Sequence, residues 1–290
     1  MTGTRKSSGH ALPLGMALTA MVSVQIGAAM GKQMFAQISP QGAVTLRVVL
    51  AALILFVVHR GWRLRPDWPA LKLVLPYGVI LGVMNLCFYL ALKTVPLAIV
   101  VAVEFIGPLS VAVLDSRRPR DLLWVALAVA GILLMRAPGL HGSVDPRGLL
   151  LAFAAGVCWG LYIIFGKRAG QLGEARATTL GMLIAALVVL PAGIAESGSR
   201  LLDVSLLPVG LLVAVLSSAL PYSLEMIAMA RLPQRTFGIL MSLEPAIAAL
   251  FGLVMLGETL TMLQLVAIAC VIAASLGSVI GIKAAEPLPP

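Results

Sequence analysis

Long runs of apolar residues are the feature that most restricts how this chain can fold. Residues 73–92 and 148–166, for example, contain no charged side chain. A helix crosses the hydrocarbon core of a bilayer with about 20 mostly apolar residues, and inside the bilayer its backbone satisfies its own hydrogen bonds. Because only 11% of the residues are charged and 60% are hydrophobic, the chain has too little polar surface to coat a soluble globule. We therefore expect an all-α integral membrane protein.

Ten such runs follow one another along the chain, and we interpret each as a transmembrane helix. The fifth run is short, but Arg120 and Arg136 flank it and can extend to opposite membrane interfaces. The first run resembles a signal peptide because Arg5 and Lys6 precede it, yet nine further runs favour an uncleaved helix. The expected helices are residues 11–35, 41–58, 73–92, 96–114, 122–135, 148–166, 177–195, 206–230, 236–256 and 260–282.

The distribution of basic residues predicts the orientation of these helices. With the N-terminus in the cytoplasm, 15 of the 21 lysines and arginines fall in cytoplasmic segments and four fall in outer segments. Cytoplasmic loops of membrane proteins are enriched in Lys and Arg, so we expect both termini in the cytoplasm. The same distribution accounts for the net charge of +9. Because the basic residues do not form dense runs, this charge does not indicate nucleic-acid binding.

The two halves of the chain resemble each other. Pro96 and Pro108 in the first half match Pro233 and Pro245 in the second half at the same spacing. An odd number of helices per repeat inverts the second repeat in the membrane, which is a recurring plan of secondary transporters. The alternative is chance similarity between two apolar sequences. On the repeat interpretation, the first five-helix repeat covers residues 1–140 and the second covers residues 147–283. A short cytoplasmic tail follows at residues 284–290.

Five ionisable residues fall inside the expected helices, where each costs about 2.5–3.5 kcal/mol and is a candidate functional residue. They are Lys32, Arg47, Glu104, Glu225 and Glu244. We expect Glu104 and Glu244, midway along corresponding helices, to flank a central cavity and bind an ammonium group or a proton. Alternatively, each is protonated or paired and only holds helices together. Glu225 is equally open to a role at an inner vestibule and to structural pairing.

Lys32 and Arg47 are both expected toward the outer side of the membrane. Either residue can offer a cationic partner to a substrate carboxylate or bridge to an acidic side chain. Lys32, near its helix end, can instead extend to the outer lipid headgroups. The uncharged residues best placed to line a path are Asn85, Tyr89, Trp159, Tyr162 and Tyr222. The four aromatic residues of this set have an alternative role, because aromatic side chains are common as packing or interface anchors.

The sequence contains no pattern typical of catalysis, of a metal site or of a bound cofactor. The cysteines Cys87, Cys158 and Cys270 occur singly in apolar runs, without metal or disulfide spacing. No nucleotide-binding loop is present, so we expect no direct coupling to ATP. An ion gradient is the natural alternative source of energy, with a carboxyl group in the membrane as the proton carrier.

Two stretches resemble a known family of exporters. They are VPLAIVVAVEFIGPLSVAVLDSRRPRD at residues 95–121 and LSSALPYSLEMIAMARLPQRTFGILMSLEPAIAALFGLVMLGETL at residues 216–260. Together with Pro245 and the Gly257-Glu258 pair, they resemble the EamA-type drug/metabolite transporter superfamily, in particular its bacterial inner-membrane threonine and homoserine exporters. The first half has Asp115-Ser116 where a counterpart of Gly257-Glu258 would stand, so we expect Glu258 to be a structural cap.

The resemblance implies proton-driven export of small amino acids by alternating access of the two repeats, with protons, the amino acid and the lipid bilayer as the partners. An alternative keeps the class of protein and changes the substrate to an aromatic amino acid, a purine or a drug. A further alternative is a membrane enzyme or a passive channel. An enzyme needs a reactive cluster of side chains, which the sequence does not show, and a channel would work without a proton gradient.

Overall fold

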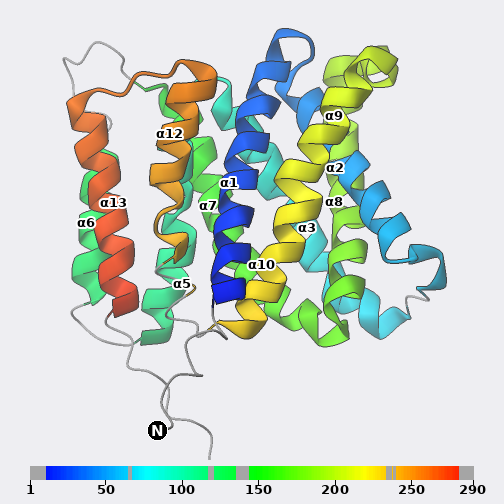
Figure 1. Cartoon of the computed structure of the whole chain (residues 1–290), viewed down its shortest axis with the longest axis horizontal. Helices are drawn as coiled ribbons and strands as arrows, with labels where there is room; N and C mark the ends of the chain where they lie inside the picture. Colours follow the sequence, from blue (N-terminus) through cyan, green and yellow to red (C-terminus); the bar gives the residue numbers. More distant parts are fainter. Residues whose placement is uncertain are drawn as a thin grey trace, which may run out of the picture.

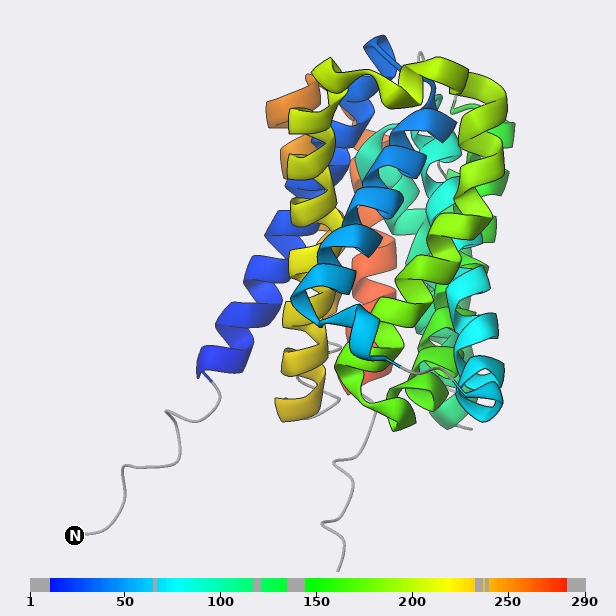
Figure 2. The same ribbon diagram turned by 90° about the vertical axis from the view of Figure 1, so that its right-hand side faces the viewer.

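The computed structural model describes residues 11–64, 67–116, 121–134, 144–232, 237 and 240–280. Within these residues every regular element is a helix and none is a strand, which confirms the predicted all-α class. The axes of the helices are roughly aligned, with chain directions up and down, and the helices form one bundle, as two views at right angles show (Figures 1 and 2).

The α-helices and the shorter helical turns have the following bounds. The α-helices are α1 (Ala11–Gln33), α2 (Pro40–Val58), α3 (Trp68–Leu92), α4 (Leu97–Glu104), α5 (Ile106–Ser116), α6 (Asp121–Leu134), α7 (Pro146–Ala169), α8 (Glu174–Ser197), α9 (Leu207–Ala214), α10 (Leu220–Arg231), α12 (Glu244–Leu256) and α13 (Met262–Ile280). The 3-10 turns are η1 (Met34–Ala36), η2 (Gly61–Arg63), η3 (Gly170–Leu172), η4 (Gly198–Leu202) and η5 (Val204–Leu206), and a π-helical turn, η6 (Val215–Ala219), joins α9 to α10.

Six helical stretches among the described residues are long and apolar enough to cross a membrane. They are Leu12–Ala36, Pro40–Val58, Trp68–Leu92, Pro146–Leu172, Glu174–Leu202 and Val204–Glu225. Shorter apolar helices cover Leu97–Val111, Glu244–Leu256 and Met262–Gly277. The chain is therefore a multi-pass helical membrane protein. The short fifth run of the sequence forms a helix as well, α6.

Local sequence determines where several of the helices begin. The side chains of Ser39, Asp67 and Asp145 cap α2, α3 and α7, because an oxygen of each accepts a backbone N–H from the first helical turn. A proline follows each cap within the first two helical positions, where its missing N–H costs nothing.

Helices that are distant in the sequence pack against one another. Helix α3 packs against α7 and α8, α2 against α8, and α1 against α10 and α12. Figure 1 shows α6 and α13 side by side at one end of the bundle and α2, α8 and α9 at the other. Two large clusters of buried apolar residues stabilise this arrangement. One centres on α2, α3 and α8, and the other centres on α4, α12 and α13.

Two of the expected continuous helices are interrupted, which corrects the sequence prediction at residues 96–114 and 236–256. Pro108 has no N–H to donate to the carbonyl of Glu104, and the helix breaks at Phe105 between α4 and α5. Helix α12 begins only at Glu244, after a turn, with Pro245 in its first turn. Glu104 is therefore the last residue of α4 and Glu244 the first of α12, and neither lies midway along a helix.

The helix expected over residues 206–230 also departs from regular geometry. Pro221 cannot donate to the carbonyl of Ser217, and at this point the chain forms the π-helical turn η6. The Ser23 hydroxyl of α1 donates to the Leu216 carbonyl at 2.6 Å. A Cβ atom on Gly27 would lie only 2.6 Å from the Ser217 Cβ, so glycine is needed for α1 to approach η6 this closely.

The break between α4 and α5 is held against α7 by two glycines. A Cβ atom on Gly107 would collide with the carbonyl oxygen of Gly156, and a Cβ atom on Gly156 would lie 2.7 Å from the carbonyl oxygen of Glu104. Small residues allow membrane helices to approach this closely. The contact fixes the position of the Glu104 backbone against α7.

Candidate functional site

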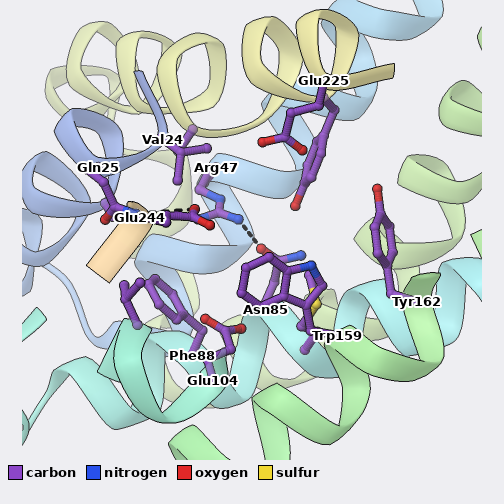
Figure 3. Close-up of a pocket in the computed structure, with 15 residues that line it drawn as sticks. Val24, Gln25, Arg47, Asn85, Phe88, Glu104, Trp159, Tyr162, Glu225 and Glu244 are labelled. Carbon is purple, nitrogen blue, oxygen red and sulfur yellow. Dashed lines mark hydrogen bonds between the residues drawn. The ribbon is translucent and has the colours of Figure 1, made fainter. Parts of the chain in front are cut away.

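A cavity of about 90 Å³ that contains charged side chains lies within the bundle, between α1, α2, α3, α4, α7, η6, α10 and α12 (Figure 3). Its polar lining consists of Gln25, Arg47, Asn85, Glu104, Trp159, Tyr162, Ser217, Tyr222, Glu225 and Glu244. Its apolar lining consists of Val24, Ala28, Met84, Phe88 and Val101. The volume has room for a few water molecules or a small metabolite, and is well below the pockets of about 300–1,000 Å³ that hold drug-sized ligands.

Arg47 supplies the positive charge of this cavity. Its side chain is only 4% exposed, and its guanidinium group donates to the Asn85 side-chain oxygen. Asn85 is held in turn, because its amide donates to the Leu81 carbonyl at 2.7 Å. The guanidinium carbon lies 4.9 Å from the centre of the Tyr89 ring, a cation–π contact. The Arg47 Nε atom has no hydrogen-bond partner, and among the described residues no carboxylate forms an ion pair with Arg47.

Among the described residues, three carboxyl groups share the cavity with Arg47, and no second cation lines it. Glu104 and Glu244 are 8% and 5% exposed, and Glu225 enters from α10. Figure 3 shows the three carboxyl groups pointing inward from different helices. Glu104 and Glu244 both lie at helix breaks, where backbone polar groups lack their regular helical partners. Discontinuous helices of this kind form the substrate sites of many secondary transporters.

Aromatic residues border the cavity on the side of α7 and α10. The Tyr162 ring lies 6.3 Å from the Tyr222 ring and 5.2 Å from the Tyr77 ring, measured between centres. Trp159 meets Phe105 edge to face at 5.5 Å, beside the break between α4 and α5. These contacts fix the aromatic walls around Glu225 and Glu104.

Eight of the ten residues selected from the sequence line this cavity. Tyr89 does not line it, but its fully buried ring packs against Arg47 and so supports the cavity from behind. Lys32 lies elsewhere, since its ammonium group is 2.7 Å from a carboxylate oxygen of Glu258 and 3.0 Å from the Val95 carbonyl. Of the roles considered for Lys32, the structure shows the bridge to an acidic residue.

Glu258 forms a second contact that explains its position after α12. Its other carboxylate oxygen accepts the backbone N–H of Leu97 at 2.8 Å, at the start of α4. Gly257 has a positive φ of 65°, and the N–H of Glu258 donates to the Gly252 carbonyl, as at many helix ends. Glu258 is thus a structural link between α1, α4 and α12.

Gln25 and Ser217 are the polar lining residues that the sequence analysis missed. Neither is ionisable, so neither stands out by the cost of burying a charge in an apolar run. Gln25 is only 1% exposed, and its amide nitrogen lies 3.4 Å from a Glu244 oxygen. An uncharged amide in the middle of an otherwise apolar helix is the signal that identifies Gln25.

A bundle of membrane-spanning helices around a buried, charged cavity is typical of small-molecule membrane transporters. Comparison with known proteins gives the family. The chain matches the EamA-like transporter family over residues 12–137 and 146–280, and it belongs to that family. This confirms the resemblance that the sequence indicates, and it places the chain among transporters rather than enzymes.

The chain is similar over nearly its whole length to curated exporters. It is 48% identical over 98% of its length to the threonine/homoserine exporter RhtA of Escherichia coli (strain K12), covering 96% of that protein. The same values hold for the threonine/homoserine exporter RhtA of Salmonella typhimurium (strain LT2). Among solved structures, one crystal structure superposes with a TM-score of 0.60 at 18% identity, covering 92% of this chain and 96% of the other, which shows a shared fold.

Proposed function

We propose that this chain exports small amino acids of the threonine and homoserine type across the bacterial inner membrane. The observation that carries the proposal is that Arg47, which has an unpartnered donor atom, and several carboxyl groups line the same small cavity. A zwitterionic amino acid carries a carboxylate and an ammonium group, so it complements both sets of groups. The similarity to exporters of threonine and homoserine supports the same substrate class.

The binding mode follows from the charges. The substrate carboxylate is drawn to the Arg47 guanidinium, whose planar donors match a carboxylate. The ammonium group faces Glu104 or Glu244. Lys32 takes no part in this mode because Glu258 holds its ammonium group. The small cavity favours a small amino acid over the alternative substrates, which are an aromatic amino acid, a purine or a drug.

The proposed architecture is ten transmembrane helices in two inverted five-helix repeats, with both termini in the cytoplasm. Two observations support it: the family matches the chain twice, once in each half, and helix breaks next to Pro108 and Pro245 occur at corresponding positions. In transporters built from inverted repeats, the site lies between the repeats and is exposed to each side in turn. We extend that alternating access to this chain.

Proton coupling is the second part of the proposal. A carboxyl group in the cavity binds a proton from the outer side and releases it to the cytoplasm, and substrate moves outward in the same cycle. Glu104 and Glu244 are the candidate carriers because both are buried and neither forms an ion pair among the described residues.

Whole-cell extrusion of threonine tests this function. Cells that produce the chain are loaded with threonine, and release is measured with and without an uncoupler. We expect Glu104→Gln and Glu244→Gln each to abolish extrusion while the protein still inserts, and Glu196→Gln, at an exposed residue, to leave it unchanged. Full extrusion in both cavity variants would refute the role of the two glutamates. Extrusion that survives the uncoupler would refute proton coupling.

A further inference from the structure

Gln25 and Glu244 form a pair at the wall of the cavity that α1 and α12 build. The Gln25 side-chain nitrogen donates to one carboxyl oxygen of Glu244 over 3.4 Å. The Gln25 side-chain oxygen and the second Glu244 oxygen have no hydrogen-bond partner, although both are buried. Both residues line the cavity, and Figure 3 shows their polar groups together beside it.

Unpartnered polar atoms at these positions need an explanation. A buried oxygen that lacks a hydrogen bond costs about 1–3 kcal/mol, and most buried polar groups in native proteins are satisfied. Two such atoms on adjacent side chains, facing the same cavity, are the expected feature of a site whose ligand supplies the missing hydrogen bonds.

The ammonium group of an amino-acid substrate has a better position elsewhere. Ammonium and carboxylate are attached to the same carbon atom, so the group that binds the ammonium must be near Arg47. Both Glu104 and Glu244 line the cavity with Arg47, but Glu244 is already bound by the Gln25 amide, so Glu104 is the better partner for the ammonium group. With the carboxylate at Arg47 and the ammonium at Glu104, the side chain of the substrate is free to extend toward Gln25 and Glu244.

We propose that Gln25 and Glu244 form a subsite for the side-chain hydroxyl of the substrate, which makes Gln25 a specificity-determining residue. This inference rests on the proposed amino-acid export. A hydroxyl group is both a donor and an acceptor. It donates to the Gln25 oxygen and accepts from Glu244 in its protonated form, while the Gln25 nitrogen donates to the other Glu244 oxygen. The three groups then form a closed ring of hydrogen bonds in which every buried atom is satisfied.

The subsite also keeps the charges of the loaded cavity balanced, provided that Glu225, the third carboxyl group of the lining, is protonated as well. Arg47 and the substrate carboxylate neutralise each other, as do Glu104 and the substrate ammonium group. Glu244, in its protonated form, adds no uncompensated charge. Hydroxyl recognition therefore acts through the same carboxyl group that is a candidate proton carrier, and an amino acid without a hydroxyl leaves the Gln25 oxygen unsatisfied.

The test compares threonine with valine, which has a methyl group in place of the hydroxyl. Inside-out membrane vesicles are energised, and uptake of each radiolabelled amino acid is measured for the wild type and for Gln25→Met. We expect the wild type to prefer threonine by about 10- to 100-fold in kcat/KM. We expect Gln25→Met to lower threonine uptake by a much larger factor than valine uptake, so that the ratio of the two falls toward one.

Two further variants make the test decisive. Gln33→Met makes the same substitution on the same helix outside the cavity, and we expect it to keep the preference for threonine. Gln25→Asn keeps the carboxamide, and we expect it to retain part of the preference. Valine uptake reports that each variant is folded, and the wild-type comparison requires no variant at all.

The outcomes separate this inference from the proposed function. If the wild type takes up threonine and valine equally, or if Gln25→Met lowers both uptakes by the same factor, the hydroxyl subsite is refuted and amino-acid export stands. If wild-type vesicles take up neither amino acid, export itself is refuted, and the subsite with it.

Discussion

The link between Lys32 and Glu258 yields a prediction about stability whose size follows from the structure. The Glu258 carboxylate accepts two hydrogen bonds, one from the Lys32 ammonium group at 2.7 Å and one from the Leu97 N–H at 2.8 Å. Leu97 is fully buried and begins α4, so its N–H has no partner within its own helix. Glu258→Ala removes both contacts at once.

The expected loss is the sum of two effects. A buried N–H without an acceptor costs about 1–3 kcal/mol. The ion pair, with side chains 21% and 13% exposed, is partly shielded from water and contributes roughly 1 kcal/mol more. A loss of about 2–4 kcal/mol corresponds to a fall of roughly 5–15 °C in the unfolding midpoint. Glu258→Gln keeps an oxygen for Leu97, and we expect it to lose less than half of that amount.

The assay is thermal unfolding of the purified protein in detergent. Glu196→Ala, at an exposed position, is the control and should change the midpoint by less than about 1 °C. Combining Glu258→Ala with Lys32→Met should cost less than the sum of the single changes, because both remove the same ion pair. A Glu258→Ala protein as stable as the control, or additive effects in the double variant, would refute this reasoning.

Three further predictions concern packing, support of the cavity and pH. Gly107→Ala should cost about 1–3 kcal/mol in detergent unfolding because its Cβ would meet the α7 backbone, whereas Gly170→Ala, with open space around it, should be neutral. Tyr89→Phe removes an unpartnered buried hydroxyl and should retain stability and threonine transport. Tyr89→Leu removes the cation–π contact with Arg47 and should lower transport. Equal transport in both variants would contradict the role of the Tyr89 ring in supporting Arg47. The backbone N–H of Arg147 donates to the Asp145 carboxylate and lowers the pKa of that carboxyl group. This cap therefore stabilises the fold above a pH of about 4, and its contribution is lost as the pH falls through the lowered pKa. Over that pH range, the unfolding midpoint of Asp145→Asn should fall less than that of the wild type.

The sequence predicts the helical class and most of the cavity for one physical reason. Charges are costly in a bilayer, so the few that remain in apolar runs mark the polar interior. Arg47, Glu104, Glu225 and Glu244 all line the cavity as a result. Lys32 is the exception, because its partner, Glu258, is 226 residues away, and hydropathy contains no information about such pairing.

The helix breaks and the uncharged lining residues are harder to predict. Pro108 and Pro245 indicate that regular hydrogen bonding fails nearby, but a proline in a membrane helix produces either a kink or a full break. Which one occurs depends on packing, such as the approach of Gly107 to α7. The sequence shows Gln25 as an uncharged amide in an apolar helix, but its place in the cavity and its unpartnered oxygen are visible only in the tertiary structure.

Counterflow of threonine in proteoliposomes tests the central claim most directly. The purified chain is reconstituted into liposomes preloaded with unlabelled threonine, and the entry of radiolabelled threonine is followed for the wild type and for Arg47→Met. We predict transient accumulation of label with the wild type and an accumulation at least about 30-fold lower with Arg47→Met. The reason is that Arg47 and the substrate carboxylate form a buried, hydrogen-bonded charge pair in the proposed binding mode, and removing one member of such a pair costs about 2–5 kcal/mol. Accumulation by Arg47→Met equal to that of the wild type, or wild-type accumulation no greater than in liposomes without protein, would contradict the claim that an amino acid crosses the membrane through this cavity.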